Sequence, residues 1–159
     1  MIPQMGPMAA AVKAIDQATT FYVKDLEALS EDQILLPAAG NARAAVDFTF
    51  ETAFINRQIA ARLRGDEPIA DTGGDEWVVA PEELRSKLAI IKYASESFAD
   101  LLDSARGVTE EEAGKMVGSA GRERPAFALA NFAAMHTMYH DAQLNFIQSL
   151  NGDLKMHWN

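Results

Sequence analysis

Apolar and weakly polar residues recur along most of this chain at alternating steps of four and three. This period limits the possible folds more than any other feature. Residues 8–29 show it without a gap, at Met8, Val12, Ile15, Thr19, Tyr22, Leu26 and Leu29. Such spacing places the side chains on one face of an α-helix. Because that face must be buried, the pattern predicts an amphipathic helix over residues 8–29 that packs against other elements.

Three further segments, residues 41–65, 81–107 and 125–152, carry the same period. Residues that commonly begin or end helices mark their boundaries: Asn41, Gly65, Pro81 followed by Glu82 and Glu83, Gly107, Pro125 and Gly152. No segment shows the sustained alternation that is typical of a strand. We therefore expect an all-α fold, a four-helix bundle that residues 1–159 form as one domain.

Two capping boxes are predicted between the long helices. Ser30 with Gln33 indicates one short turn, and Thr109 with Glu112 indicates a short helix. The last residues, 155–159, are expected to fray because chain termini are seldom held in place.

Two long loops are predicted, over residues 66–80 and 114–124. Loops of this length are uncommon in a compact domain and are often functional. Trp77, with Val78 and Val79, lies in the first loop. It either covers a functional site or packs onto the side of the helices, and the second interpretation is favoured.

The composition excludes several classes of function. The chain has no cysteine, so disulfides, thiolate zinc sites and cysteine nucleophiles are excluded, and a cytoplasmic protein is expected. The net charge of −9 offers no basic surface for a nucleic acid. No apolar run is long enough to span a membrane, and we expect no secretion signal. A small-molecule substrate remains the expected partner.

His136 and His140 are two of the three histidines and lie one helical turn apart. They fall on the stripe of the last helix that the period predicts to be buried: Leu129, Ala133, His136, His140, Gln143, Ile147 and Leu150. The ends of this stripe are apolar and its middle is polar. Buried polar groups need partners, and one metal ion would satisfy both imidazoles.

Two histidines do not complete a metal site, and Glu51 is the best candidate for a third ligand. It interrupts an apolar face of the second helix and has Phe48, Phe50, Phe54 and Ile55 as neighbours in sequence. A carboxylate among such neighbours is rarely left unpaired. Asp47 is the reserve candidate and His157 a third. The alternative is that the two histidines hydrogen-bond each other, Gln143, Tyr139 or Glu51 without any metal.

Other catalytic motifs are absent. The zinc metalloprotease motif requires Glu directly after its first histidine, and Thr137 occupies that position. Gly73 and Gly74 stand alone rather than in a phosphate-binding loop, and no serine lies in a nucleophile elbow.

The stretch Pro125–Leu144 contains His136-x-x-x-His140 followed by x-x-Gln143-Leu, and with it the chain resembles the DinB/YfiT-like proteins. The order and lengths of the predicted helices and loops agree with that superfamily of metal-binding four-helix bundles. The resemblance implies an up-down-down-up bundle, commonly a homodimer, with a divalent metal ion at one end of its interior. It implies metal ligands at His136 and His140, and a third ligand in the second helix that is usually a histidine.

This chain departs from the family because Glu51 lies where the third histidine is expected. Either the site is a His₂-carboxylate version, or tight metal binding has been lost. The first is favoured, since an acid rather than an apolar residue replaces the ligand. Zinc, nickel, iron and manganese all remain candidates.

The resulting hypothesis is a metal-dependent enzyme. By analogy with characterised relatives of such families, the ion would activate a low-molecular-weight thiol for S-transfer, with Gln143 and Tyr139 orienting the ligands. Histidine ligation also predicts that metal affinity falls as the pH decreases through the range of about 7 to 6.

One alternative is a non-catalytic, stress-related dimeric helical protein. Another is a metal-dependent hydrolase with Asp47 or Asp141 as general base.

Overall fold

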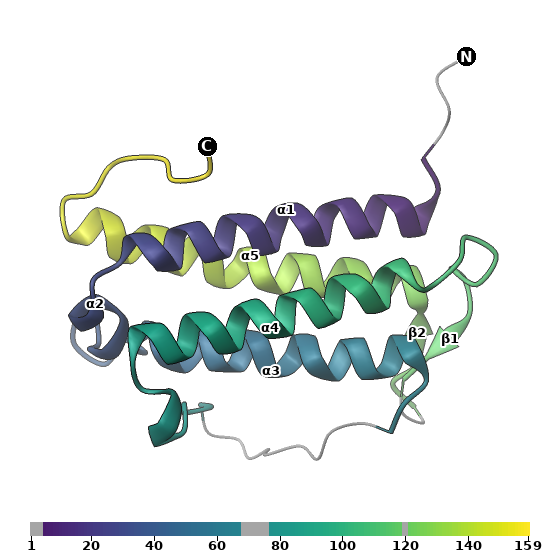
Figure 1. Ribbon diagram of the computed structural model, residues 1–159, viewed down its shortest axis with the longest axis horizontal. Coiled ribbons are helices and arrows are strands. Elements are labelled where there is room, and N and C mark those ends of the chain that lie inside the picture. Colours follow the sequence, from purple (N-terminus) through teal and green to yellow (C-terminus); the bar gives the residue numbers. More distant parts are fainter. Residues whose placement is uncertain (1–4, 68–76, 119–120) are drawn as a thin grey trace.

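The computed structural model describes residues 5–67, 77–118 and 121–159. Four long helices run side by side: α1 (Pro7–Ala28), α3 (Ala45–Arg64), α4 (Lys87–Arg106) and α5 (Ala126–Leu150). Two short ones accompany them, α2 (Glu31–Leu35) and the 3₁₀ turn η1 (Glu82–Leu84). Helices α1 and α5 run in one direction, and α3 and α4 run in the opposite one (Figure 1). The predicted helical fold is confirmed.

The four long helices bury one interior between them. Helix α1 packs on α5 and α4, and α3 packs on α4 and α5. The core near the start of α1 is built from Met8, Ile15 and Leu101 together with many alanines of α5, whose small side chains allow close helix approach. Toward the other end of α1, larger side chains such as Tyr22 and Phe48 fill the interior. None of the described helices combines the length and apolar character that a membrane span needs.

Several helix boundaries are confirmed. Helix α1 begins and ends within one residue of the predicted limits. At α2, the backbone N–H of Gln33 donates to the Ser30 hydroxyl while Gln33 accepts from the Ser30 N–H, which is the predicted capping box. Helix α3 ends at Gly65 with a φ of 79°, a left-handed conformation that favours glycine.

Two predicted helix starts are wrong. Asn41 does not cap α3, because residue 44 pairs with Pro37 in an isolated antiparallel bridge and the helix begins only at Ala45. Pro81 does not open α4, since the residues after it form only the 3₁₀ turn η1. Ser86 caps α4 instead, with its hydroxyl accepting from the Ala89 N–H at 3.2 Å. The start of α4 is therefore set by the Ser86 hydroxyl, which accepts from a free N–H of the first turn, and not by Pro81.

The irregular segments also differ from the prediction. Only half of the capping box predicted at Thr109 and Glu112 forms. The Thr109 N–H donates to the Glu112 carboxylate, but the Thr109 hydroxyl also donates to that carboxylate, and the residues enclose a turn rather than a helix. The second loop contains two short antiparallel strands, β1 (Met116–Val117) and β2 (Arg124–Pro125), which the sequence did not indicate. Residues 68–76 of the first predicted loop and residues 119–120 of the second lie outside the described residues.

The chain end is held against α1, so the predicted fraying of residues 155–159 is wrong for Trp158. Its indole stacks on Phe21 with ring centroids 4.4 Å apart, and its Nε1 donates to Asp25 Oδ2 at 2.6 Å. Lys24 donates to the Trp158 carbonyl at 3.1 Å. One stacked ring and two hydrogen bonds therefore anchor the tail.

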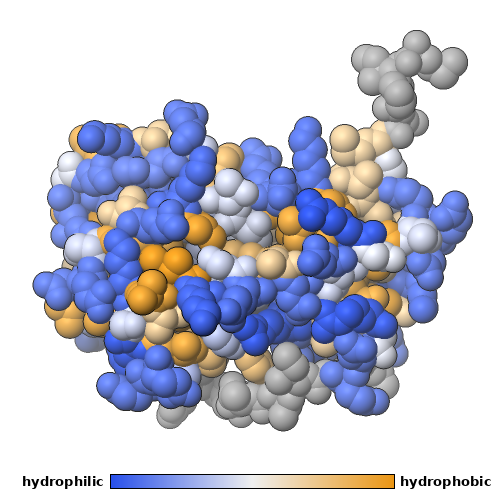
Figure 2. Space-filling model, in the orientation of Figure 1, coloured by the Kyte–Doolittle hydropathy of each residue, from blue (hydrophilic) through white to orange (hydrophobic). Residues whose placement is uncertain are grey.

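The face of the molecule seen in Figure 2 is largely covered by hydrophilic side chains, and its hydrophobic ones lie in separate small patches. This distribution agrees with acidic residues that act as solvated surface groups rather than as a binding site.

Candidate metal centre

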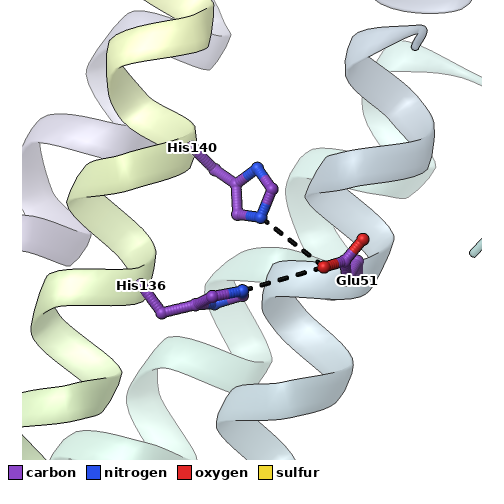
Figure 3. A group of neighbouring side chains, drawn as sticks. All are labelled: Glu51, His136 and His140. Atoms are coloured by element: carbon purple, nitrogen blue, oxygen red, sulfur yellow. Dashed lines mark ion pairs between the residues drawn. The ribbon is translucent and has the colours of Figure 1, made fainter. Parts of the chain in front are cut away.

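The side chains of Glu51, His136 and His140 converge between α3 and α5 (Figure 3). Each offers one ligand atom, and these atoms lie within 4.8 Å of one another. The His136 Nε2 atom is 3.8 Å from Glu51 Oε1, and the His140 Nε2 atom is 3.7 Å from the same oxygen. The structure therefore brings together the three residues that the sequence singled out.

The position of the two histidines on α5 differs from the predicted stripe. The residues most deeply buried along this helix include Ala133, Thr137 and Leu144, all with no exposed area. His140 is buried and His136 is half-buried, whereas Leu150 is exposed. The buried face is thus rotated from the predicted one, and the histidines lie at its border, where they can reach α3 and an open pocket together.

The separations between ligand atoms fit a shared ion. With metal–ligand bonds of about 2.0–2.1 Å, two ligands of one tetrahedral ion lie roughly 3.4 Å apart. The observed 3.7 and 3.8 Å are close to that value. They exceed an N–H···O hydrogen bond of about 2.7–3.2 Å, so direct bonds between the histidines and Glu51 do not explain the cluster. One carboxylate and two imidazoles form a donor set that suits zinc and other divalent transition metals.

The orientation of the His140 ring is set by its neighbours. Its Nδ1 lies 2.7 Å from Gln143 Oε1, and its ring stacks on Phe48 with centroids 5.5 Å apart. Because the amide oxygen can only accept, this bond places the proton on Nδ1 and leaves the Nε2 lone pair directed at the site. The His136 ring stacks on Phe132, and its Nδ1 is buried without a hydrogen-bond partner among the described residues.

Arg43 completes the electrostatics of the site, and sequence reasoning missed it. Its Nη2 pairs with Glu51 Oε2 at 2.5 Å. The pKa of Glu51 is held well below its usual range by His136 and His140 facing it, and further by Arg43, despite partial burial. Glu51 is therefore ionised and available as a ligand. Arg43 precedes α3 in an irregular segment, where no periodic pattern indicates which way a side chain points.

The reserve ligands lie elsewhere. Asp47 Oδ1 accepts from the Ala80 N–H at 3.0 Å and from Arg85 at 2.8 Å, so it anchors the segment that follows the first loop. His157 pairs with Asp153 at 2.8 Å near the chain end. Neither belongs to the cluster of three. The predicted orienting role of Tyr139 has a weaker basis than that of Gln143, since the structure gives Tyr139 an edge contact with the His140 ring and leaves it mostly exposed.

A pocket of about 490 Å³ opens onto the three candidate ligands. Polar groups lie around the ligands, among them Arg43 and Gln143, and much of the remaining lining is apolar. Trp77 lies at this pocket with its ring 4.8 Å from the Arg43 guanidinium carbon. The position expected for Trp77 on the side of the helices is therefore wrong, and the other interpretation, a residue next to the site, fits better.

No family model and no curated relative matches this chain. Its fold is similar to the crystal structure of a conserved protein from Enterococcus faecalis, with a TM-score of 0.69 over 92% of this chain and 98% of that one. The two sequences are 13% identical, so the likeness concerns the fold and not the activity.

Proposed function

We propose that this protein holds one divalent metal ion through Glu51, His136 and His140 and acts as a metal-dependent enzyme on a small molecule. The observation that supports this most is that one carboxylate and two imidazoles, from two helices, converge in the lining of a pocket. Three protein ligands leave at least one coordination position for a substrate, as catalytic sites require.

When bound, such an ion supplies a positive charge that lowers the pKa of a ligand such as a low-molecular-weight thiol, which favours S-transfer. The residues of this chain prepare the site for that role. Glu51 is ionised, and Gln143 holds the His140 ring in the correct tautomer. Apolar residues such as Phe48 and Ile147 line the pocket beside these polar groups and offer contacts to a small molecule.

The proposed family is the DinB/YfiT-like superfamily, with an up-down-down-up four-helix bundle. Supporting observations are the shared direction of α1 and α5, the opposite direction of α3 and α4, and the position of Glu51 on the second long helix (Figure 1). As in that family, we propose that the protein is a homodimer.

Metal analysis tests the proposal directly. We expect purified protein to bind about one equivalent of Zn²⁺, Ni²⁺, Mn²⁺ or Fe²⁺, measured by elemental analysis and calorimetry. His136→Ala and His140→Ala should abolish that binding. His157→Ala is the matched control, because His157 pairs with Asp153 outside the site. Thiol-transfer assays with and without chelator then test the reaction. Protein that binds none of these ions at neutral pH would contradict the proposal.

A second candidate function is the non-catalytic, stress-related dimeric protein, and one observation favours its dimeric part. On α5, four apolar or aromatic residues are each more than half exposed: Met135, Tyr139, Phe146 and Leu150. An exposed apolar row of this kind is typical of a protein interface. Light scattering of the wild type and Met135→Glu would test it. Under this candidate, replacing His136 and His140 by glutamine leaves the dimer and the function intact.

No observation favours the hydrolase. Its general base would be Asp47 or Asp141, and neither lines the pocket. Asp47 is bonded to Ala80 and Arg85, and Asp141 is fully buried on the side of α5 that faces α1.

A further inference from the structure

Arg43 is a cation placed beside the candidate metal ligands, and its hydrogen-bonding capacity is only partly used. Within the described residues its polar contacts are made by Nη2, which contacts Glu51 Oε2 and donates to the Val78 carbonyl at 3.1 Å. Its Nε is buried without a hydrogen-bond partner among the described residues. A guanidinium has five N–H donors in a planar fork that matches a carboxylate. Arg43 therefore retains donors that a bound anion could use.

The charges of the pocket favour such an anion. Arg43 and Glu51 form an ion pair whose charges cancel, so a divalent ion adds two positive charges to the site. The lining of the described pocket contains no further acidic residue besides Glu51. Because the Arg43 and Glu51 side chains are only 14% and 17% exposed, solvent screens these charges incompletely. An anionic ligand would compensate the excess charge, and a neutral one would not.

The rest of the lining favours an apolar body on that ligand. Phe146, Ile147 and Leu150 of α5 line the pocket with Trp77 and Tyr139. Trp77, Tyr139 and Phe146 are each more than 60% exposed, so their rings are available to a bound molecule. Aromatic rings of this kind bind flat apolar groups by stacking and by burial of surface.

We propose that the pocket binds small organic carboxylates that carry an aromatic or similarly bulky apolar group. Arg43 pairs with the carboxylate beside the metal ion, and Trp77 and Phe146 contact the apolar group. This inference rests on the proposed function, because the excess positive charge comes from the ion. It adds the class of substrate and makes Arg43 the residue that determines specificity.

Three matched probes test the inference: 3-phenylpropanoate, the neutral 3-phenylpropan-1-ol, and acetate. Each is titrated into Zn²⁺-loaded protein by calorimetry after the metal stoichiometry has been measured. We expect 3-phenylpropanoate to bind about tenfold or more tightly than either other probe, since a charge-assisted hydrogen bond and a buried ring each contribute at least that factor. We also expect quenching of tryptophan fluorescence that disappears in Trp77→Phe.

Variants at two arginines separate the role of Arg43 from a general effect of charge. In Arg43→Gln the preference for 3-phenylpropanoate over the alcohol should fall below about threefold. The Zn²⁺ affinity of this variant is measured first, and the preference is then compared with both proteins saturated with Zn²⁺. The control is Arg57→Gln. The Arg57 Nε is also buried without a hydrogen-bond partner among the described residues, and its guanidinium carbon lies 4.3 Å from the centre of the Tyr93 ring. Arg57 does not line the pocket. It should keep the full preference.

The outcomes distinguish the two proposals. Failure to bind any of Zn²⁺, Ni²⁺, Mn²⁺ and Fe²⁺ would overturn the proposed function and this inference with it. Normal Zn²⁺ binding with equal affinities for the carboxylate and the alcohol would overturn the inference alone. An undiminished preference in Arg43→Gln would overturn the role of Arg43.

Discussion

Helix α5 carries two polar clusters on opposite sides, and they differ in charge and access. On one side His136 and His140 face Glu51 of α3, next to an open pocket. On the other side Asp141 faces Asp25 of α1, and neither acid has any exposed area. The first cluster joins a carboxylate to two imidazoles, with the cation Arg43 beside them, whereas the second joins two acids.

In the second cluster, amide and indole N–H groups donate hydrogen bonds to Asp25. Asp25 accepts from Asn145 at 2.8 Å, from Gln148 at 3.0 Å and from Trp158 at 2.6 Å. Asp141 has no donor on either carboxylate oxygen among the described residues. Burial, and then the charge of Asp25 beside it, raises the pKa of Asp141 to about 8.

The difference shows how the surroundings assign roles to buried acids. Glu51 is ionised because cationic and imidazole groups face it, and an ionised carboxylate can bind a metal. Asp141 keeps its proton to about pH 8 because it is buried and because a second carboxyl faces it. A candidate site and a structural acid pair thus lie on two sides of one helix.

The largest expected effect is a loss of metal affinity, which a substitution in the first cluster should cause and a substitution in the second should not. Glu51→Gln keeps the shape of the side chain but removes its charge, and metal affinity should fall about a thousandfold, or about 4 kcal/mol. Glu51→His should retain binding, because it restores a third imidazole. Both are measured by calorimetry against Asp141→Asn, which should bind as the wild type does. Equal affinities in Glu51→Gln and wild type would remove Glu51 from the site.

The second prediction concerns the acid pair and pH. The folded-state pKa of Asp141, about 8, exceeds the ordinary aspartate pKa of 3.8, so the folded protein binds more protons between these pH values. Stability should therefore decrease as the pH rises through that window, by up to about 1.4 kcal/mol per pH unit. Asp141→Asn should lack this decrease and gain about 3 kcal/mol relative to wild type between pH 5 and 8. Urea unfolding at several pH values measures this, and parallel curves for the two proteins would contradict it.

A smaller effect is expected from the residue that orients His140. Gln143→Leu removes the acceptor for Nδ1–H, and metal affinity should fall about tenfold because the ring and its tautomer are no longer held. Gln143→Glu should preserve affinity, since a carboxylate accepts the same bond. Full affinity in the leucine variant would show that packing against Phe48 alone orients the ring.

The smallest effect is expected at the chain end. Trp158→Phe keeps the stacking on Phe21 but removes the bond from Nε1 to Asp25. The free energy of unfolding should fall by about 1–2 kcal/mol, because a buried acid loses one of its donors. The metal affinity should not change, since Phe21, Lys24 and Asp25, which Trp158 contacts, all belong to α1 and not to the metal site. Reduced metal affinity would indicate that the two clusters are coupled.

Local patterns accounted for much of the fold and part of the site. The four-three period identified the four long helices, and Ser30, Gly65 and Gly107 marked boundaries correctly. The spacing of His136 and His140 placed both on one side of α5 because one helical turn separates them. Glu51 was identifiable because a carboxylate among phenylalanines needs a partner.

What could not be predicted depends on how the helices are rotated against each other. The period placed His136 and His140 at the centre of the buried face of α5, but packing against α1 and α3 buried Thr137 and Asp141 more deeply. The pairing of Asp141 with Asp25 joins residues 116 positions apart, and no local pattern indicates it.

The sequence by itself determined the long helices and the candidate ligands on two of them, Glu51 on one and His136 and His140 on the other. It could do so because helical periodicity is a property of residues three and four positions apart. Only the tertiary structure decided that Arg43 lies against Glu51, that Trp77 lies at the pocket, and that Asp141 faces another acid. These contacts join an irregular segment or a separate helix to the site. Their geometry follows from the packing of whole helices, which short-range spacing does not specify.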